Sequence, residues 1–197
     1  MSILIKKNIE ELINKKIILV TNNFNKIQIQ PASLDLTLSS NCYRIKASFI
    51  PNNKKVSQLI ESLAISKINL NNENLLEKNC IYLCELNESL KLNIEFSAKS
   101  NPKSTTGRLD IFTRLITDNG KEYDVVDKGY KGKLYLEIIP QSFSVIVKKG
   151  LSLNQIRFYK NQQINNSFIK SEDISIYIKK NEICAYKAKK NTSAINL

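Results

Sequence analysis

A polar segment between two apolar runs carries residues suited to binding an anion. The segment Ser97–Phe112 reads SAKSNPKSTTGRLDIF. Its centre combines two cations with small hydroxyl residues and a glycine, namely Lys103, Ser104, Thr105, Thr106, Gly107 and Arg108. Small side chains let backbone N–H groups approach phosphate oxygens, while lysine supplies charge and arginine supplies forked donors. The GxxxxGK[ST] spacing of a Walker A loop is absent, and a simple turn between strands remains the alternative interpretation.

Glu137 is the second residue with chemical potential, because it lies inside the apolar run KLYLEII. On a strand, alternation places it on one face with Tyr135 and Ile139. Either this face meets solvent, or the carboxylate points into a pocket where it can act as a general base. The periodicity leaves both interpretations open.

The residue types exclude several kinds of catalysis. The chain has 197 residues and no histidine, which rules out Ser-His-Asp and Cys-His nucleophile systems and histidine-ligated zinc. Four cysteines are present, at Cys42, Cys80, Cys84 and Cys184. We expect the pair in CIYLC to pack in the core as reduced thiols rather than to bind a metal, since free cysteine behaves as a small buried hydrophobe.

The charge balance is basic, with 30 Lys and Arg against 18 Asp and Glu and a formal net charge of +12. The accompanying excess of Asn, Lys and Ile is also typical of an AT-rich genome, so the charge indicates an anionic partner only weakly. No nucleic-acid-binding motif is found, and we expect no specific nucleic-acid partner. The sequence contains neither an apolar run of about 18 residues nor a signal peptide, which predicts no membrane partner and a cytoplasmic location.

Short β-rich runs dominate the pattern of elements. Helical spacing of apolar residues predicts one helix over Ser2–Lys15, with Ser2 as its N-cap, and a second over Lys55–Ala64. The runs expected to form strands are IQIQ, SLDLTL, CYRIKASFI, IYLCEL, SLKLNIEF, LDIFTRLI, KLYLEII, FSVIVKK, LSLNQIRFY and ISIYI. Glycine and proline are few, so we expect asparagines to occupy many left-handed turn positions. Together these features predict an all-β sandwich or barrel with one or two short helices.

We expect the 197 residues to form a single domain, because no linker rich in glycine, proline or serine divides them. A break is expected at Asn161–Ser167, and the lysine-rich tail at 187–197 is expected to fray.

Four ordered motifs resemble those of the dCTP deaminase and dUTPase superfamily. They are PASLDLTL at 31–38, KSTTGRLDIF at 103–112, DKGYKGKLYLEI at 127–138 and GLSLNQIRF at 150–158, within a core of about 28–160. The segment NPKSTTGRLDIFTRLITD is similar to part of the amino-terminal half of the long alphaproteobacterial dCTP deaminases.

The resemblance implies a distorted jelly-roll β-barrel that assembles as a homotrimer with active sites at subunit boundaries. It implies zinc-independent hydrolysis of dCTP to dUTP and ammonia, with Mg²⁺ carried by the triphosphate and no metal bound by the protein itself. Glu137 matches the catalytic carboxylate, which would take a proton from the attacking water.

The same resemblance implies roles for the substrate-binding residues. Arg108 would clamp the triphosphate, together with Lys103 and the Ser104–Gly107 segment. Asp127 would lie near the deoxyribose, and Gln155 matches a glutamine with a structural role. The backbone of Tyr135 and Leu136 would read the edge of the cytosine, and dUTP would share this site as product.

Several departures from the family pattern keep alternatives open. Thr37 and Ser39 replace the usual arginine and glycine, and Arg114–Asp124 is longer than the usual connection. The segment that folds over the phosphates in short deaminases has no clear match in Asn161–Leu197. One alternative is therefore a non-catalytic or incomplete nucleotide-binding half of a two-domain deaminase, and another is a dUTPase.

Overall fold

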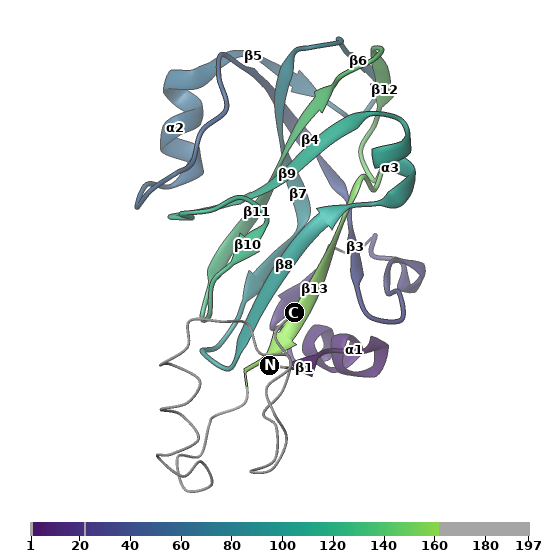
Figure 1. The fold of residues 1–197 in the computed structure, drawn as a ribbon, viewed down its shortest axis with the longest axis vertical. Helices are drawn as coiled ribbons and strands as arrows, with labels where there is room; N and C mark the ends of the chain where they lie inside the picture. The colour runs from purple at the N-terminus through teal and green to yellow at the C-terminus, as the bar shows by residue number, and fades with distance from the viewer. Residues whose placement is uncertain (1, 22, 162–197) are drawn as a thin grey trace, which may run out of the picture. The chain divides into compact units, whose positions relative to one another are not determined.

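Antiparallel strands organise the chain in a computed structural model, which describes residues 2–21 and 23–161 (Figure 1). The strands form two large sheets and one small one. The first, the β8–β13 sheet, has the order β1-β13-β8-β10, with β3 also paired to β13. Its strands are β1 (Ser2–Ile3), β3 (Leu34–Leu36), β8 (Phe96–Pro102), β10 (Val125–Val126) and β13 (Asn154–Lys160).

The second, the β7–β11 sheet, has the order β5-β4-β7-β11-β9, with β2 also paired to β7. Its strands are β2 (Ile18–Leu19), β4 (Leu38–Ile45), β5 (Ala64–Asn69), β7 (Ile81–Lys91), β9 (Ile111–Thr117) and β11 (Lys131–Pro140). Two short strands, β6 (Asn74–Leu76) and β12 (Val145–Val147), pair separately. Strand β11 is thus an interior strand between β7 and β9.

Four short helical segments complete the described residues, namely α1 (Lys6–Asn14), the 3-10 turn η1 (Lys26–Gln28), α2 (Val56–Leu63) and α3 (Ser104–Arg108). In Figure 1, α2 and α3 lie on opposite sides of the long strands. None of these helices is long and apolar enough to cross a membrane.

Strand β11 is buried on both of its faces. Leu134, Leu136 and Ile138 belong to the main core, which both large sheets and α1 build. Tyr135, on the opposite face, packs in a second, smaller core with Val56 and Ile60 of α2. Because each face has its own cover, every residue from 134 to 138 is buried.

Helix α2 is fixed to the rest of the chain by a loop that is distant in sequence. The Val56 N–H at its first turn donates to Asp118 Oδ1 at 2.8 Å. Next to this contact, the Asn52 N–H donates to Gly120 O and the Asn119 N–H to Lys54 O. These bonds join the 50–56 loop to the 118–124 loop, so the cover of the second core is a tied structure.

Several sequence expectations are confirmed. The helix at Lys55–Ala64 is α2, and the strands expected from IYLCEL, LDIFTRLI and KLYLEII are β7, β9 and β11. Asparagines occupy left-handed positions as expected, at Asn52, Asn53, Asn79 and Asn119.

Other expectations are wrong in detail. The first helix begins at Lys6, and Ser2 lies in β1 opposite Lys160 instead of capping a helix. The run IQIQ begins within the turn η1 (Lys26–Gln28), because the Asn25 side chain accepts a hydrogen bond from the Ile27 N–H and favours a tight turn.

The boundaries of two further strands differ from the expectation, and three other features lie outside the described residues. The strand expected from CYRIKASFI ends at Ile45, and SLKLNIEF is divided between β7 and β8 by a turn. The run ISIYI, the break at Asn161–Ser167 and the tail at 187–197 fall outside the described residues, apart from Asn161 itself.

The cysteines of the two central strands pack in the main core as expected. Cys42 on β4 faces Cys84 on β7 with 2.7 Å between the sulfur atoms, and both are free and buried. Burial raises the pKa of the Cys84 thiol. Cys80 is half-buried and accepts from Arg44 Nη2 at 3.0 Å. Cys184 lies outside the described residues.

The two-faced burial of β11 yields a stability prediction. Ile138→Ala should lower the free energy of unfolding by about 2–5 kcal/mol, because Ile138 is fully buried in the main core. Ile146→Ala is the matched control and should change it by less than about 0.5 kcal/mol, because Ile146 is 64% exposed. Urea unfolding of the three proteins measures the difference, and equal midpoints would contradict the assigned register.

Candidate active site

Glu137 lies at the centre of the candidate site and is completely buried. Its Oε1 accepts from Arg114 Nε at 2.9 Å and from Arg114 Nη2 at 2.5 Å. Its Oε2 is also buried and has no hydrogen-bond partner within residues 2–21 and 23–161. The carboxylate therefore has one oxygen held by Arg114 and one oxygen that is buried without a partner in the described chain.

Arg114 faces Glu137 directly across the ladder between β9 and β11. The centre of its guanidinium lies 4.9 Å from the centroid of the Phe112 ring and 3.9 Å from that of the Tyr123 ring. None of the sequence motifs predicted a role for Arg114. The available signal was a single arginine inside the apolar run LDIFTRLI, a position that also suits an exposed strand face.

Two titratable residues from the 118–124 loop surround this ion pair. Asp124 Oδ1 accepts from the Leu115 N–H at 2.8 Å, and burial raises the pKa of the Asp124 carboxyl above its usual value. Burial likewise raises the pKa of the Tyr123 hydroxyl. Glu137 thus sits in surroundings from which water is largely excluded, and there electrostatic interactions are stronger than in solution.

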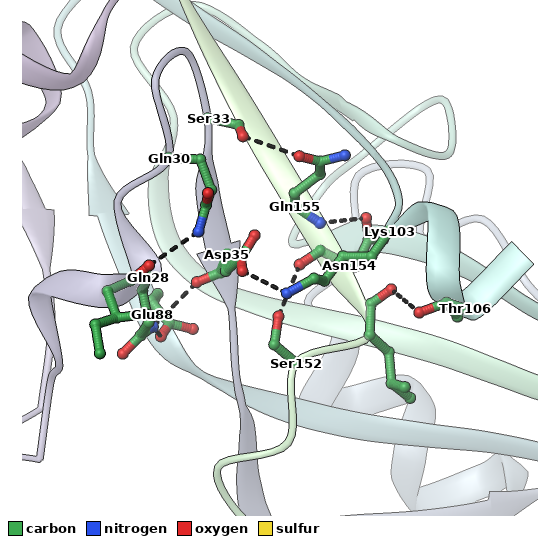
Figure 2. A network of polar contacts seen from close by, with 12 residues as sticks. Gln28, Gln30, Ser33, Asp35, Glu88, Lys103, Thr106, Ser152, Asn154 and Gln155 are labelled. Atoms are coloured by element: carbon green, nitrogen blue, oxygen red, sulfur yellow. Dashed lines mark hydrogen bonds and ion pairs between the residues drawn. The ribbon is translucent and has the colours of Figure 1, made fainter.

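The predicted anion-binding segment forms the short helix α3, with Lys103 just before it. Lys103 Nζ lies 2.5 Å from Oδ2 of Asp35, a buried residue on β3 (Figure 2). Thr106 is also buried, and its hydroxyl donates to Leu153 O at 2.8 Å. These two side chains attach the segment to the β8–β13 sheet.

The remaining residues of the segment face solvent. Ser104, Thr105, Gly107 and Arg108 are exposed, and a Cβ at Gly107 would meet no atom within 4 Å. Arg108 Nε contacts only the Ser104 carbonyl, at 3.3 Å, among the hydrogen-bond partners in the described chain. The open side of α3 can therefore receive an anion, with Arg108 as its accessible cation.

Gln155 and Asp127 occupy separate places. Gln155 Oε1 accepts from the Ser33 hydroxyl at 2.9 Å, which fits the expected structural role (Figure 2). Asp127 is exposed in the turn that precedes β11. No hydrogen bond of the described chain connects either side chain to Glu137.

Tyr135 and Leu136 lie on the same strand as Glu137, but their backbone groups belong to an interior strand. Tyr135 is paired with Glu85 and Ile116, and Leu136 is paired with residues of the same two neighbouring strands. The expectation that their backbone reads a base therefore stays a prediction.

The structure thus separates the predicted residues into two groups. One group, around Glu137, lies on the face of the β7–β11 sheet that carries the second core. The other, Lys103–Arg108, is attached to the β8–β13 sheet. No hydrogen bond or ion pair within the described ranges joins the two groups.

A cavity of about 810 Å³ is lined by Asp35 among other residues and does not include Glu137 in its lining. Its walls contain Gln28, Thr37, Asn87 and Lys149. Behind them, the buried Glu88 accepts from the Thr37 N–H and from the hydroxyl of the same residue. Thr37, which departs from the family pattern, is therefore a partner of a buried carboxylate.

The side chains that could donate to a metal ion are not clustered in the described residues. Across this part of the chain, no group of three or more Cys, Asp or Glu side chains is arranged to hold a metal ion.

Known proteins with similar sequences and structures indicate the family of this chain. A dCTP deaminase from Agrobacterium tumefaciens is 42% identical in its solved structure, with a TM-score of 0.78 over 81% of this chain and 49% of that chain. This match supports the expected jelly-roll β-barrel. The chain thus spans about half the length of the Agrobacterium protein.

Curated relatives are similar over more of their length. A protein named "dCTP deaminase, dUMP-forming" from Methanococcus maripaludis strain C5 is 25% identical over 96% of both chains. The protein of the same name from strain C6 is 28% identical over 80% of this chain and 81% of its own.

Residues 1–162 match the family described as 2'-deoxycytidine 5'-triphosphate deaminase (DCD) N-terminal domain. This match covers all of the described strands and both groups of candidate residues. On this evidence, the chain belongs to the dCTP deaminase N-terminal domain family.

Proposed function

We propose that this protein is a dCTP deaminase that replaces the 4-amino group of cytosine with a carbonyl and releases ammonia. The observation that carries the proposal is the completely buried Glu137, which has one oxygen held by Arg114 and one oxygen without a partner. The names of the relatives support the choice of dCTP as substrate.

In the proposed mechanism, Glu137 acts first as a base. Its free Oε2 takes a proton from a water molecule while the water oxygen attacks C4 of the cytosine ring. The same carboxyl then delivers that proton to N3 of the ring, which leaves C4 with both a hydroxyl and the amino group. The carboxylate next takes the hydroxyl proton and gives it to the amino nitrogen. The C4–N bond breaks, ammonia leaves, C4 keeps the oxygen as a carbonyl, and N3 keeps its hydrogen. No histidine is available in the chain for either step.

Arg108 is proposed to bind the triphosphate, because it is the accessible cation on the open side of α3. Lys103 acts differently from the sequence expectation. Its ammonium is paired with Asp35, so we propose that it holds α3 in place. Asp127 remains the proposed neighbour of the deoxyribose. Mg²⁺ is proposed to arrive on the phosphate oxygens, and no chemical step is assigned to it.

We propose that the protein is located in the cytoplasm and assembles as a homotrimer. The separation of the two residue groups within one chain supports the assembly. In an oligomer, Lys103–Arg108 of one subunit can lie beside Glu137 of the next, which would complete the site. This separation is equally compatible with a second deaminase half that supplies the missing surface.

Two alternatives are supported by specific observations. The chain spans 49% of the Agrobacterium protein, which favours an incomplete half that binds nucleotide without turnover. The relatives named dUMP-forming favour a product that has also lost diphosphate, an activity that overlaps with the dUTPase alternative. Identifying the product of dCTP as dUTP, dUMP or neither separates these possibilities.

Replacing the proposed base gives the main prediction. Glu137→Gln should lower kcat for dCTP by about 10³–10⁴-fold, because the amide cannot take a proton from water. The matched control is Glu73→Gln, which alters an exposed ion pair and should leave kcat unchanged. Chromatography of the uracil nucleotide together with an ammonia assay measures turnover. Full activity in Glu137→Gln would refute the mechanism.

Replacing the accessible cation should affect binding more than chemistry. Arg108→Gln should raise KM for dCTP by about tenfold or more and change kcat little, if the phosphate contact is equally strong in the ground state and the transition state. Arg44→Gln, which alters an exposed ion pair with Glu77, is the control. An unchanged KM in Arg108→Gln would remove Arg108 from the site.

Mixed oligomers test whether the site is shared between subunits. We expect co-expressed Arg108→Gln and Glu137→Gln chains to recover part of the activity at low dCTP, because some sites then contain both native residues. Each variant expressed alone provides the baseline, and light scattering gives the mass. A mixture no more active than its two components would indicate that each site lies within one chain.

A further inference from the structure

A buried carboxylate is costly unless an opposite charge and hydrogen bonds compensate it. Glu137 receives that compensation from Arg114, which is the partner in the only ion pair it makes within residues 2–21 and 23–161. The choice of the carboxylate oxygen that accepts the hydrogen bonds from Arg114 indicates what this ion pair does.

Arginine commonly binds a carboxylate with two parallel hydrogen bonds, one to each oxygen. Here both arginine nitrogens, Nε and Nη2, donate to the same oxygen, Oε1 of Glu137. Oε2 is left buried and without a partner in the described chain. The two oxygens of one carboxylate are therefore not equivalent.

We propose that Arg114 is a positioning residue for the deamination, which fixes Glu137 through Oε1 so that Oε2 exchanges the proton with the attacking water. This inference rests on the function proposed above and deepens it. Arg114 touches the base and not the reacting atoms, so its effect is transmitted through the orientation and charge of Glu137.

The aromatic rings of Phe112 and Tyr123 hold Arg114 in this arrangement. Phe112 lies two residues before Arg114 on the same face of β9, while Tyr123 comes from the 118–124 loop. A planar guanidinium stacks on such rings, whereas a lysine ammonium provides only a point charge on a flexible stem. The site is therefore built for arginine in particular.

The Arg114–Asp124 connection supplies Tyr123, and the hydrogen bonds between the 50–56 and 118–124 loops hold this connection in place. The two loops therefore support the ion pair from outside the sheet.

The charged and titratable groups around Glu137 define an expected effect of pH. From β9 and the following loop they are Arg114, Tyr123 and Asp124. The facing residue on β7 is Leu83, and α2 contributes the apolar Val56 and Ile60 to this core. Arg114 is thus the cation shared by two acidic groups, Glu137 and Asp124. Without it, a buried carboxylate ionises only at higher pH.

The experiment compares Arg114→Ala, Arg114→Lys and the exposed control Arg44→Gln with the unaltered protein. Arg114→Ala should lower kcat by about 100-fold or more, with a smaller change in KM for dCTP. The acidic limb of its kcat/KM profile should move up by about 1–3 pH units, because the base must now lose its proton without a counter-charge. Arg114→Lys should recover only part of kcat, and Arg44→Gln should leave both kcat and the profile unchanged.

Chemical rescue distinguishes positioning from general support of the fold. Added methylguanidinium should restore part of the kcat of Arg114→Ala and return the acidic limb toward its original pH, whereas methylammonium should do so less. A normal kcat and an unmoved profile in Arg114→Ala would overturn the inference. A lost kcat with no profile shift and no rescue would overturn it as well.

Two further measurements cover the cases in which Arg114→Ala does not fold or the unaltered protein does not turn over dCTP. Should Arg114→Ala fail to fold, Tyr123→Leu removes one supporting ring and keeps the ion pair, and it should lower kcat in the same direction by a smaller factor. An unchanged kcat in Tyr123→Leu would then overturn the inference. Turnover of dCTP by the unaltered protein is measured first, so that failure of the proposed function is recognised separately from failure of the Arg114 role.

Discussion

Closing a carboxylate off from water imposes a requirement on the whole sheet, because the compensating charge must lie within hydrogen-bond reach. Glu137 meets that requirement through Arg114, which comes from the adjacent strand 23 residues earlier. The contact exists only in one register of β9 against β11. A slip of one residue would turn Arg114 toward the opposite face and place a cation in the apolar main core. The register of the sheet and the state of the candidate base are therefore linked.

The second core also follows from the need to exclude water from Glu137. A strand that carries Glu137 on one face can exclude water from it only if that face is covered, and α2 and the two joined loops provide the cover. Covering the face also explains why Tyr135 is buried although it lies opposite the main core. The loop contacts far from Glu137 in sequence thus belong to the physical support of the site, together with the ring of Tyr123.

Local signals in the sequence predicted the elements better than they predicted the site. The amphipathic pattern of Lys55–Ala64 was sufficient for α2, because a helix face is set by residues close in sequence. The alternation in KLYLEII placed Glu137 opposite Leu136 correctly, yet it could not decide whether that face meets solvent, since the cover comes from residues 56–60. Arg114 was missed for the same reason. Lys103 was expected to bind phosphate because its charge was visible in the sequence, whereas its pairing with Asp35, 68 residues away, was not.

The way α3 is attached limits how the site can be completed. The Lys103 N–H and the Thr106 hydroxyl both donate to Leu153 O, and the Lys103 ammonium pairs with the buried Asp35. Moving α3 toward Glu137 within one chain would break these contacts, and it would leave the buried Asp35 carboxylate without its counter-charge, which is costly. The β7–β11 sheet is equally constrained by its register. Neither part can therefore approach the other cheaply within one chain, and the attachment of α3 and the register of the β7–β11 sheet together keep Lys103–Arg108 and Glu137 in their separate places.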